Sequence, residues 1–293
     1  MNFGHNQEDD GNITIQPSSL MKKLKDVDQT EGLTRPEFFE SYFNREPVVM
    51  NNMISDWPAT REWSPEYFKC KYGEEDVEII NHDANDETHL ESFLKNDILE
   101  TTLADFVDSL DSIEKSHALR EEYNIFEMLP GLIDDVNHFA PFTTKESCLL
   151  ENFYKALWFG PKGYVTGMHA DFGHLLLFHI YGHKRILLFA PDQTEFLYEE
   201  IMETSEADES MPEDVAGYFS ENVRWAKVNA LKPDYQKHPL FEQAQYYESY
   251  LGPGQVLYLP NQWWHTVESR DISISISADL DEANLFKYMP DYD

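Results

Sequence analysis

His169 and Asp171 are separated by a single residue, and residues with this spacing in a β-strand point to the same face. An imidazole nitrogen and a carboxylate oxygen would therefore converge there. A further histidine, His265, follows a Gly-Pro turn much later in the chain, in "GPGQVLYLPNQWWHTVES". Two histidines and one carboxylate form the facial set that holds non-haem Fe(II) and leaves its other positions open. These three residues are the candidate metal ligands, although the short His-Asp spacing alone also fits an ordinary surface pair.

Three more histidines follow this pair closely. Strand alternation counted from Asp171 points His174 away from the metal. His179 shares the face of Asp171, but it lies eight residues further on, too far for direct ligation at about 3.3 Å per residue. We therefore expect His179 to be a core or pocket histidine with a hydrogen-bond partner. His183 lies in the turn "YGHKR" and is expected to be exposed.

The second half of the chain must position these residues. Its short β-rich runs are separated by Gly and Pro, and they are "NFYKALWFG", "HLLLFHIYG", "KRILLFA", "YYESYLG", "QVLYLP", "HTVES" and "ISISISA". Many short strands in succession favour a mainly β fold with flanking helices, in which the strands form a closed or sandwiched antiparallel barrel. Residues 199–223 are rich in acids and contain no Lys or Arg. We expect an exposed insertion there, either a solvated loop or a lid that faces the substrate.

The first half of the chain favours helices. Thr34 is placed to cap one helix with Pro36 in its first turn, and "SPEYFKCKYG" indicates a second capped helix. "DVEIIN" is a strand candidate. Residues 86–145 are expected to be mostly helical. The apolar residues predicted to share one side of this region are Leu99, Leu103, Phe106, Val107 and Leu110.

These patterns predict four segments. They are a flexible tail over residues 1–30, a helix-rich part over 31–150 that packs on the barrel, a core over 151–282 that carries the acidic insertion, and a C-terminal tail over 283–293.

The charge of the chain limits its partners. Its 293 residues include 55 acidic and 22 basic side chains, which gives a formal net charge of −33. Such a surface repels phosphate groups, which argues against binding to nucleic acid or to an anionic membrane and leaves a basic partner open. No run reaches the roughly 18 apolar residues of a membrane span, and the N-terminus lacks the apolar region of a signal peptide. We therefore expect a cytoplasmic protein, or a nuclear one if the source is eukaryotic.

Several longer stretches are similar to a known family. "WFGPKGYVTGMHADF", "IYGHKRILLFAPDQTEFLY" and "GPGQVLYLPNQWWHTVES" together resemble the Jumonji-C/cupin-8 family of Fe(II)- and 2-oxoglutarate-dependent oxygenases. The resemblance covers roughly residues 33–280 and is closest to the small hydroxylase branch that includes factor inhibiting HIF. It implies a double-stranded β-helix core, iron held by His169, Asp171 and His265, and 2-oxoglutarate and O2 as cosubstrates.

The resemblance also implies a pocket for 2-oxoglutarate. Lys184 matches the lysine that pairs with the far carboxylate, and Thr166 matches a hydroxyl that bonds the same group. Ser277 falls where asparaginyl hydroxylases have a late-strand Asn, and Tyr123 is a substitute for a tyrosine that often completes the pocket. Leu175 departs from the family, because many relatives have an Asn at this position.

The activity implied is hydroxylation of a side chain in a protein or peptide, with release of succinate and CO2. Two alternatives stay open. One is demethylation of N-methyl-lysine within the same family, and the other is a catalytically silent cupin-fold protein that serves as a binding or scaffold module. The acidic surface would suit a basic peptide substrate, and the sequence leaves both a monomer and a dimer open.

Overall fold

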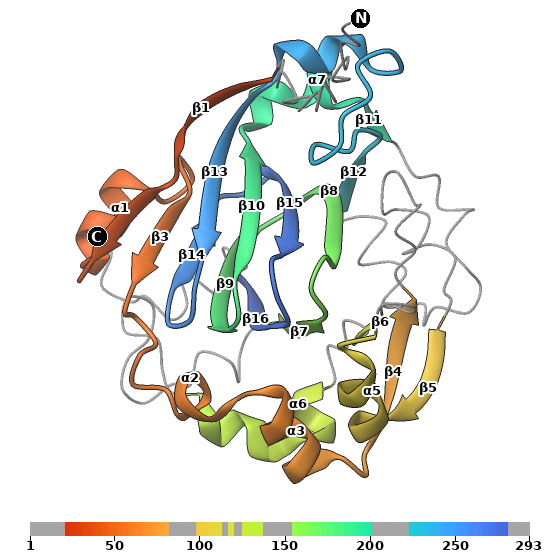
Figure 1. Ribbon diagram of the computed structural model, residues 1–293. Coiled ribbons are helices and arrows are strands. Elements are labelled where there is room, and N and C mark those ends of the chain that lie inside the picture. Colours follow the sequence, from red (N-terminus) through yellow and green to blue (C-terminus); the bar gives the residue numbers. More distant parts are fainter. Residues whose placement is uncertain are drawn as a thin grey trace, which may run out of the picture.

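Two facing β-sheets form the centre of the molecule in the computed structural model (Figure 1). The structure describes residues 21–81, 98–112, 117–119, 125–136, 154–200 and 223–280. Three sequence predictions fall outside these ranges: the role of Tyr123, the interior of the acidic insertion and the C-terminal tail.

The larger sheet, here the major sheet, has seven strands in the order β1-β13-β10-β15-β8-β12-β11. Their bounds are β1 Lys22–Asp26, β13 Gln245–Leu251, β10 Lys184–Phe189, β15 Trp264–Ser269, β8 Val165–Asp171, β12 Val223–Ala226 and β11 Glu199–Glu200. The minor sheet has six strands in the order β2-β3-β14-β9-β16-β7. Their bounds are β2 Asp28–Glu31, β3 Val48–Asn51, β14 Val256–Leu259, β9 His174–Tyr181, β16 Ser273–Leu280 and β7 Tyr154–Gly160.

Successive strands alternate between the two sheets. β8, β10, β13 and β15 lie in the major sheet, while β9, β14 and β16 lie in the minor sheet. Neighbours pair antiparallel, except that β1 runs parallel to β13 and β2 runs parallel to β3. This alternation is the double-stranded β-helix, or jelly roll, and it confirms the predicted fold class of a mainly β protein with flanking helices.

Side-chain alternation along β10 separates two layers of the core. Ile186 and Leu188 point inward between the sheets, whereas Leu187 and Phe189 point outward. The inward cluster buries Val27, Val49, Leu177, Ile186, Leu188, Tyr247, Leu251, Leu257, Leu259 and Trp263. The outward cluster of the major sheet includes Trp264 and Phe241. Both faces of this strand are thus covered, which explains its nearly continuous apolar sequence.

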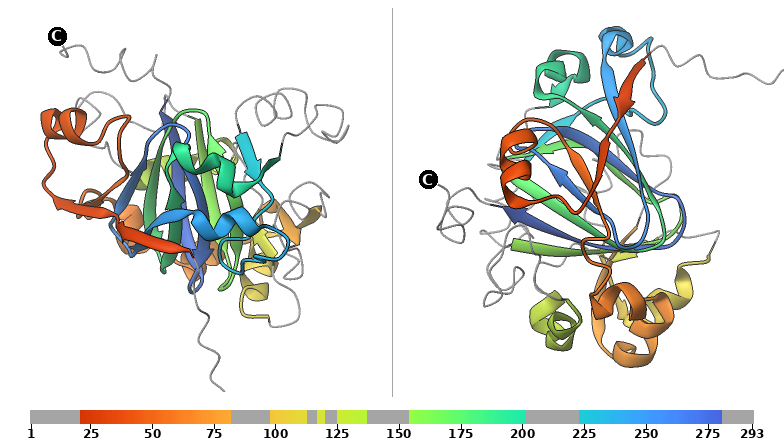
Figure 2. Two further views of the ribbon diagram at one scale, coloured as in Figure 1. Left: turned by 90° about the horizontal axis from the view of Figure 1, so that it is seen from above. Right: turned by 90° about the vertical axis from the view of Figure 1, so that its left-hand side faces the viewer.

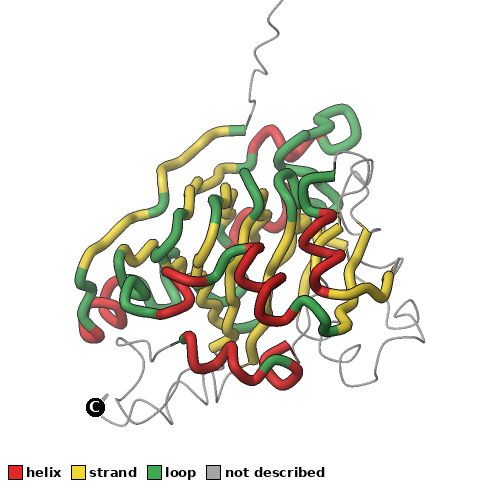
Figure 3. The backbone as a smooth tube through the Cα atoms, turned by 60° about the horizontal axis from the view of Figure 1, so that its bottom comes forward, coloured by secondary structure: helices red, strands yellow, loops and turns green. Residues whose placement is uncertain are grey.

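The N-terminal part covers the outer face of the minor sheet and one end of the barrel (Figures 1 and 2). Its helices are α1 Arg35–Ser41, α2 Pro58–Glu62, α3 Pro65–Tyr72, α5 Leu103–Ser109, α6 Ile125–Met128 and the 3-10 helix η1 Pro130–Asp135. A third sheet, in the order β5-β4-β6, consists of β4 Asp76–Asn81, β5 Ile98–Thr102 and β6 His117–Leu119. Figure 3 turns this end of the barrel toward the viewer, with the helices in red before the strands.

Short helices connect the remaining strands of the barrel. They are the 3-10 helices η3 Pro191–Gln193 and η4 Pro239–Gln243, and the α-helix α7 Thr194–Leu197. Within the described ranges, no helix is long and apolar enough to cross a membrane.

The predicted helix starts are confirmed at two positions. The carboxylate of Glu37 accepts hydrogen bonds from the backbone N–H and the hydroxyl of Thr34, at 3.0 and 2.6 Å. At the second helix, the hydroxyl of Ser64 accepts from the backbone N–H of Tyr67 at 3.1 Å. Each cap satisfies polar groups that a helix terminus leaves without partners inside the helix.

The N-terminal region differs from the sequence prediction in two places. The last part of the segment expected as a flexible tail over residues 1–30 instead forms β1 and most of β2, because each strand adds its backbone to the edge of a sheet without needing an apolar pattern. Residues 98–102 and 117–119, expected to be helical, are strands of the third sheet. Leu99 therefore lies on β5 and is 45% exposed, whereas the other four apolar residues predicted with it are buried around α5.

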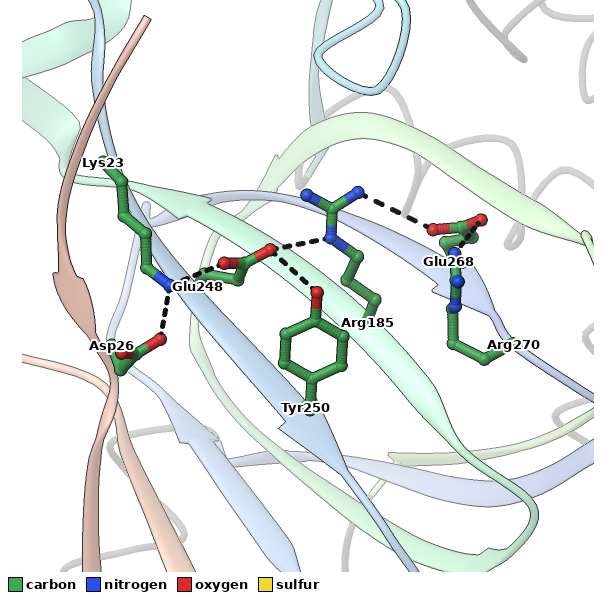
Figure 4. A network of polar contacts seen from close by, with 7 residues as sticks. All are labelled: Lys23, Asp26, Arg185, Glu248, Tyr250, Glu268 and Arg270. Atoms are coloured by element: carbon green, nitrogen blue, oxygen red, sulfur yellow. Dashed lines mark hydrogen bonds and ion pairs between the residues drawn. The ribbon is translucent and has the colours of Figure 1, made fainter. Parts of the chain in front are cut away.

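A polar network crosses the outer face of the major sheet (Figure 4). The buried carboxylate of Glu248 accepts from Lys23 and from Arg185, both at 2.7 Å, and from the hydroxyl of Tyr250 at 3.2 Å. Arg185 also lies 3.9 Å from Glu268. The network thereby joins β1, β13, β10 and β15, four consecutive strands of the sheet. Burial opposes ionisation of Glu248, but the two cations outweigh it and hold the pKa of Glu248 below its usual value.

Candidate active site

The three predicted metal ligands lie together on the inward face of the major sheet. His169 and Asp171 belong to β8, and His265 of the neighbouring β15 lies directly opposite His169. The Nε2 atoms of His169 and His265 lie 3.8 and 3.7 Å from the carboxylate oxygens of Asp171. All three ligand atoms fall within 4.8 Å of one another. The pairing of two strands distant in sequence thus creates the constellation that residue type and spacing predicted.

Backbone contacts fix the orientation of both imidazoles. The Nδ1 atom of His169 lies 2.8 Å from the carbonyl oxygen of Gly167, and that of His265 lies 3.1 Å from the carbonyl oxygen of Trp263. A carbonyl oxygen can only accept, so each Nδ1 carries the proton and donates it. In the neutral imidazole, Nε2 then presents its lone pair, and both Nε2 atoms lie toward Asp171. This is the tautomer that a metal-binding histidine needs.

Burial keeps the second histidine neutral. Desolvation first, and the nearby His169 second, lower the pKa of His265 to about 4, although Asp171 acts in the opposite direction. His169 is covered by Trp225 of β12, whose ring lies 5.2 Å away. Two imidazoles and a carboxylate in a largely buried place match the donor set of a non-haem Fe(II) centre, and Fe(II) therefore fits the residues present.

A β-bulge places Thr166 on the same face as the metal ligands. In a regular strand, residues three apart point to opposite faces. On β8, His169 pairs with His265 and Thr166 pairs with Val267, so one extra residue of β8 lies between the two pairs. Bulges of this kind re-aim side chains and are common beside active sites. Thr166 consequently faces the interior, and its carbonyl oxygen accepts from the hydroxyl of Thr266 at 2.7 Å.

Lys184 also belongs to this interior. It begins β10, is only 4% exposed, and lies opposite Ser269 of β15, while Leu188 of β10 lies opposite His265. Four residue steps along β10 therefore separate Lys184 from the level of the candidate ligand His265, or about 13 Å at 3.3 Å per step. A lysine side chain and a five-carbon dicarboxylate can fill that span together. A buried cation at this distance suits the far carboxylate of 2-oxoglutarate.

The minor sheet contributes the opposite wall. Ser277 of β16 points inward, and its hydroxyl accepts from the indole Nε1 of Trp158 at 2.8 Å. Leu175 of β9 packs with the inward cluster and offers no polar atom from its side chain. The predicted departure at Leu175 thus lies on the inward face of the sheet opposite the candidate ligands.

Two residues that sequence reasoning missed hold the end of β8. The backbone N–H of Gln262 donates to the carbonyl oxygen of Asp171 at 3.0 Å. The side-chain oxygen of Asn261 accepts from the backbone N–H of Gly173, also at 3.0 Å. Gln262 has a φ of 63°, a left-handed conformation that few non-glycine residues adopt. Such strain at the edge of a metal site is typical of functional loops, and the "PN" before Gln262 was the available turn signal.

The two histidines of β9 have structural partners. His174 is 1% exposed, stacks on Phe43 with ring centroids 4.4 Å apart, and its Nδ1 lies 2.8 Å from the hydroxyl of Tyr258. It belongs to the outer side of the minor sheet, as strand alternation predicted. His179 points inward and contacts Ser275, which confirms the expected core histidine with a hydrogen-bond partner.

His183 lies in the turn after β9. Its side chain is 63% exposed, as predicted, and its Nδ1 pairs with the carboxylate of Asp271 at 2.8 Å.

Comparisons with known proteins agree with this geometry. The profile of the cupin-like domain matches residues 35–278. Jumonji C domain-containing protein 5 of Drosophila melanogaster is 29% identical over 280 residues, which cover 90% of this chain and 62% of that protein. Lysine-specific demethylase 8 of Xenopus tropicalis is 28% identical over 242 residues, which cover 80% of this chain and 47% of that protein. HSPB1-associated protein 1 of Homo sapiens is 29% identical over 264 residues, which cover 82% of this chain and 49% of that protein.

The chain spans between 47% and 62% of the length of these three relatives. The profile match extends over most of the chain, and it includes the strands from β3 to β15, most of β16 and the three converging residues. The chain therefore belongs to the cupin-like family of JmjC-domain proteins, whose members are typically 2-oxoglutarate-dependent oxygenases.

Proposed function

We propose that the protein is an Fe(II)- and 2-oxoglutarate-dependent oxygenase that hydroxylates a side chain of a protein or peptide. One observation carries the proposal: His169, Asp171 and His265 bring two Nε2 lone pairs and a carboxylate within 4.8 Å of one another. The backbone hydrogen bonds at both Nδ1 atoms support it, because they prepare the imidazoles for ligation before any metal arrives.

The chemistry belongs to the bound groups. When bound, Fe(II) and 2-oxoglutarate supply the oxidation, in which O2 is consumed, 2-oxoglutarate becomes succinate and CO2, and a substrate C–H bond becomes C–OH. The protein holds and orients these groups. His169, Asp171 and His265 would hold the iron, while Lys184 and Thr166 would bind the far carboxylate of the cosubstrate.

The surroundings of the site restrict its contact with water, and of the three candidate ligands Asp171 is the most exposed, at 26% of its side chain. The interior beside the ligands is lined by apolar side chains of the inward cluster, among them Leu188 and Trp263, which are 0% and 5% exposed. A dry wall of this kind strengthens the electrostatic contacts at the metal and limits side reactions. The net charge of −33 favours approach of a basic peptide.

The first test is binding and turnover. Anaerobic addition of Fe(II) and 2-oxoglutarate should give the weak visible charge-transfer band of this cofactor pair, and O2 with a peptide pool should then yield succinate. His169→Ala should abolish both signals. His183→Ala, which removes an exposed histidine of the same segment, should retain them. A wild-type protein that binds Fe(II) but not 2-oxoglutarate would instead support a scaffold role, in line with the apolar Leu175 on the inward face of β9.

Demethylation of N-methyl-lysine is the second candidate, because one relative carries the name Lysine-specific demethylase 8. Mass spectrometry of the peptide products separates the two reactions. Hydroxylation adds one oxygen atom to the substrate, whereas demethylation removes one methylene unit and releases formaldehyde.

A further inference from the structure

Among the residues that the structure describes, five serines are buried along inward-facing rows of the barrel: Ser249, Ser269, Ser273, Ser275 and Ser277. Four of them have hydrogen-bond partners. Ser269 and Ser273 bond each other at 2.8 Å, Ser275 bonds Nδ1 of His179 at 2.8 Å, and Ser277 accepts from Trp158. The hydroxyl of Ser249 is the exception: it is buried and has no partner within the described part of the chain.

Ser249 lies on the inner wall beside Lys184. It belongs to β13 between Tyr247 and Leu251, which both point into the inward cluster. It pairs with Ile186 of β10, and Lys184 is the next inward residue along that strand. Diagonal neighbours on one face of an antiparallel pair are about 7–8 Å apart between backbones. The hydroxyl and the lysine side chain therefore open onto the same part of the interior.

A buried hydroxyl without a partner is costly, so natural proteins keep few of them. A carboxylate is a pure acceptor with about four lone-pair sites, and a single ammonium group does not satisfy them all. Leu175, across the barrel, contributes no side-chain donor. The one unsatisfied inward serine therefore lies where a dicarboxylate held by Lys184 would need a further donor.

We infer that Ser249 donates a hydrogen bond to the far carboxylate of 2-oxoglutarate, next to Lys184. This inference rests on the proposed function and adds a residue that determines cosubstrate affinity. Ser249 is a binding residue in this scheme, and its hydroxyl has no role at the metal.

The test compares two ligands in the Mn(II)-loaded protein by calorimetry. 2-Oxoglutarate has the far carboxylate, whereas 2-oxobutyrate has the same 2-oxo-acid end without it. Ser249→Ala should weaken 2-oxoglutarate binding about tenfold or more, because a hydrogen bond to a charged group is lost. Its affinity for 2-oxobutyrate should change by less than about twofold.

Thermal unfolding without ligand supplies a second measurement, in which Ser249→Ala should not be harmful. Ser249→Ala should leave Tm unchanged or raise it, because it removes an unsatisfied buried hydroxyl. The matched control is Ser273→Ala, which deprives Ser269 of its partner and should lower Tm while leaving 2-oxoglutarate affinity within about twofold.

Three results would overturn the inference. The first is an unchanged 2-oxoglutarate affinity in Ser249→Ala, and the second is an equal loss of affinity for 2-oxoglutarate and 2-oxobutyrate in that variant. The third is a fall in its ligand-free Tm like that of Ser273→Ala. If wild-type protein with Mn(II) binds no 2-oxoglutarate, the proposed function fails as well. Normal wild-type binding with an unaffected Ser249→Ala variant rejects only the role of Ser249.

Discussion

His179 makes the stability of the protein sensitive to mild acid. It is fully buried, its Nδ1 contacts the hydroxyl of Ser275, and its Nε2 lies 2.8 Å from the carbonyl oxygen of Gly182. The carbonyl can only accept, so Nε2 carries the single proton and Nδ1 accepts from the serine. Burial first, and the nearby Lys184 second, lower the pKa of His179 to about 3. The imidazole is therefore neutral and adds no positive charge beside the lysine.

The size of the effect follows from linkage. The unfolded chain protonates this histidine near pH 6.5, whereas the folded protein does so only near pH 3. The contribution of the neutral imidazole is thus complete above pH 6.5 and declines as the pH falls toward 3. Between pH 6 and pH 4 the loss is about 2.5 kcal/mol of unfolding free energy, at about 1.4 kcal/mol per pH unit for a group protonated only in the unfolded state.

Comparison with His179→Gln separates the pH dependence of stability that comes from this histidine from the part that comes from the many carboxylates. Glutamine can donate to Gly182 and accept from Ser275, but it does not titrate. Urea unfolding at pH 6, 5 and 4 should show the stability advantage of wild type over the variant shrinking by about 2.5 kcal/mol across the series. Ser275→Ala should lower stability at each pH and keep the acid slope. A difference between wild type and His179→Gln that stays constant with pH would refute the reasoning.

Two further substitutions test buried hydrogen bonds and ion pairs, one in the minor sheet and one in the major sheet. Tyr258→Phe should cost about 2–4 kcal/mol in urea unfolding, because its buried hydroxyl accepts from Asn44 N–H at 3.0 Å and reaches His174 at 2.8 Å; a loss below about 0.5 kcal/mol would contradict this. Glu248→Gln should cost about 1–2 kcal/mol at pH 7, a value reduced for the partial exposure of Lys23 and Arg185. Because the pKa of Glu248 is lowered in the folded state, the wild-type advantage is present above the unfolded pKa and should vanish as the pH falls through the folded one; an advantage that survives at pH 2 would contradict the assignment.

The barrel strands and the candidate metal-binding residues could be predicted because residue type and short spacings mark them. Alternation between apolar residues and Gly or Pro indicates each strand, and the type of residue identifies His169, Asp171 and His265. Strand pairing then brings His265 opposite His169. The cap at Thr34 is equally local, since its partner Glu37 lies three residues away.

Features that depend on distant backbone pairing were harder to predict. The strands over 22–31 have polar sequences and form by adding to sheet edges, so no apolar periodicity marks them. The bulge that turns Thr166 inward arises only where β8 pairs with β15, although Gly167 inside the strand was a signal for it. The missing partner of Ser249 could be recognised only when the partners of the other inward serines were known.

The pairing of β12 with β8 has a consequence for the evolution of this family. Val223 pairs with Asp171 and Trp225 with His169, so the segment between Glu200 and Val223 rejoins the sheet next to the metal ligands. The strands at its two ends, β11 and β12, pair with each other, with Glu200 opposite Trp225. New sequence can therefore be exchanged between these two anchor points while the ligand strand stays unchanged.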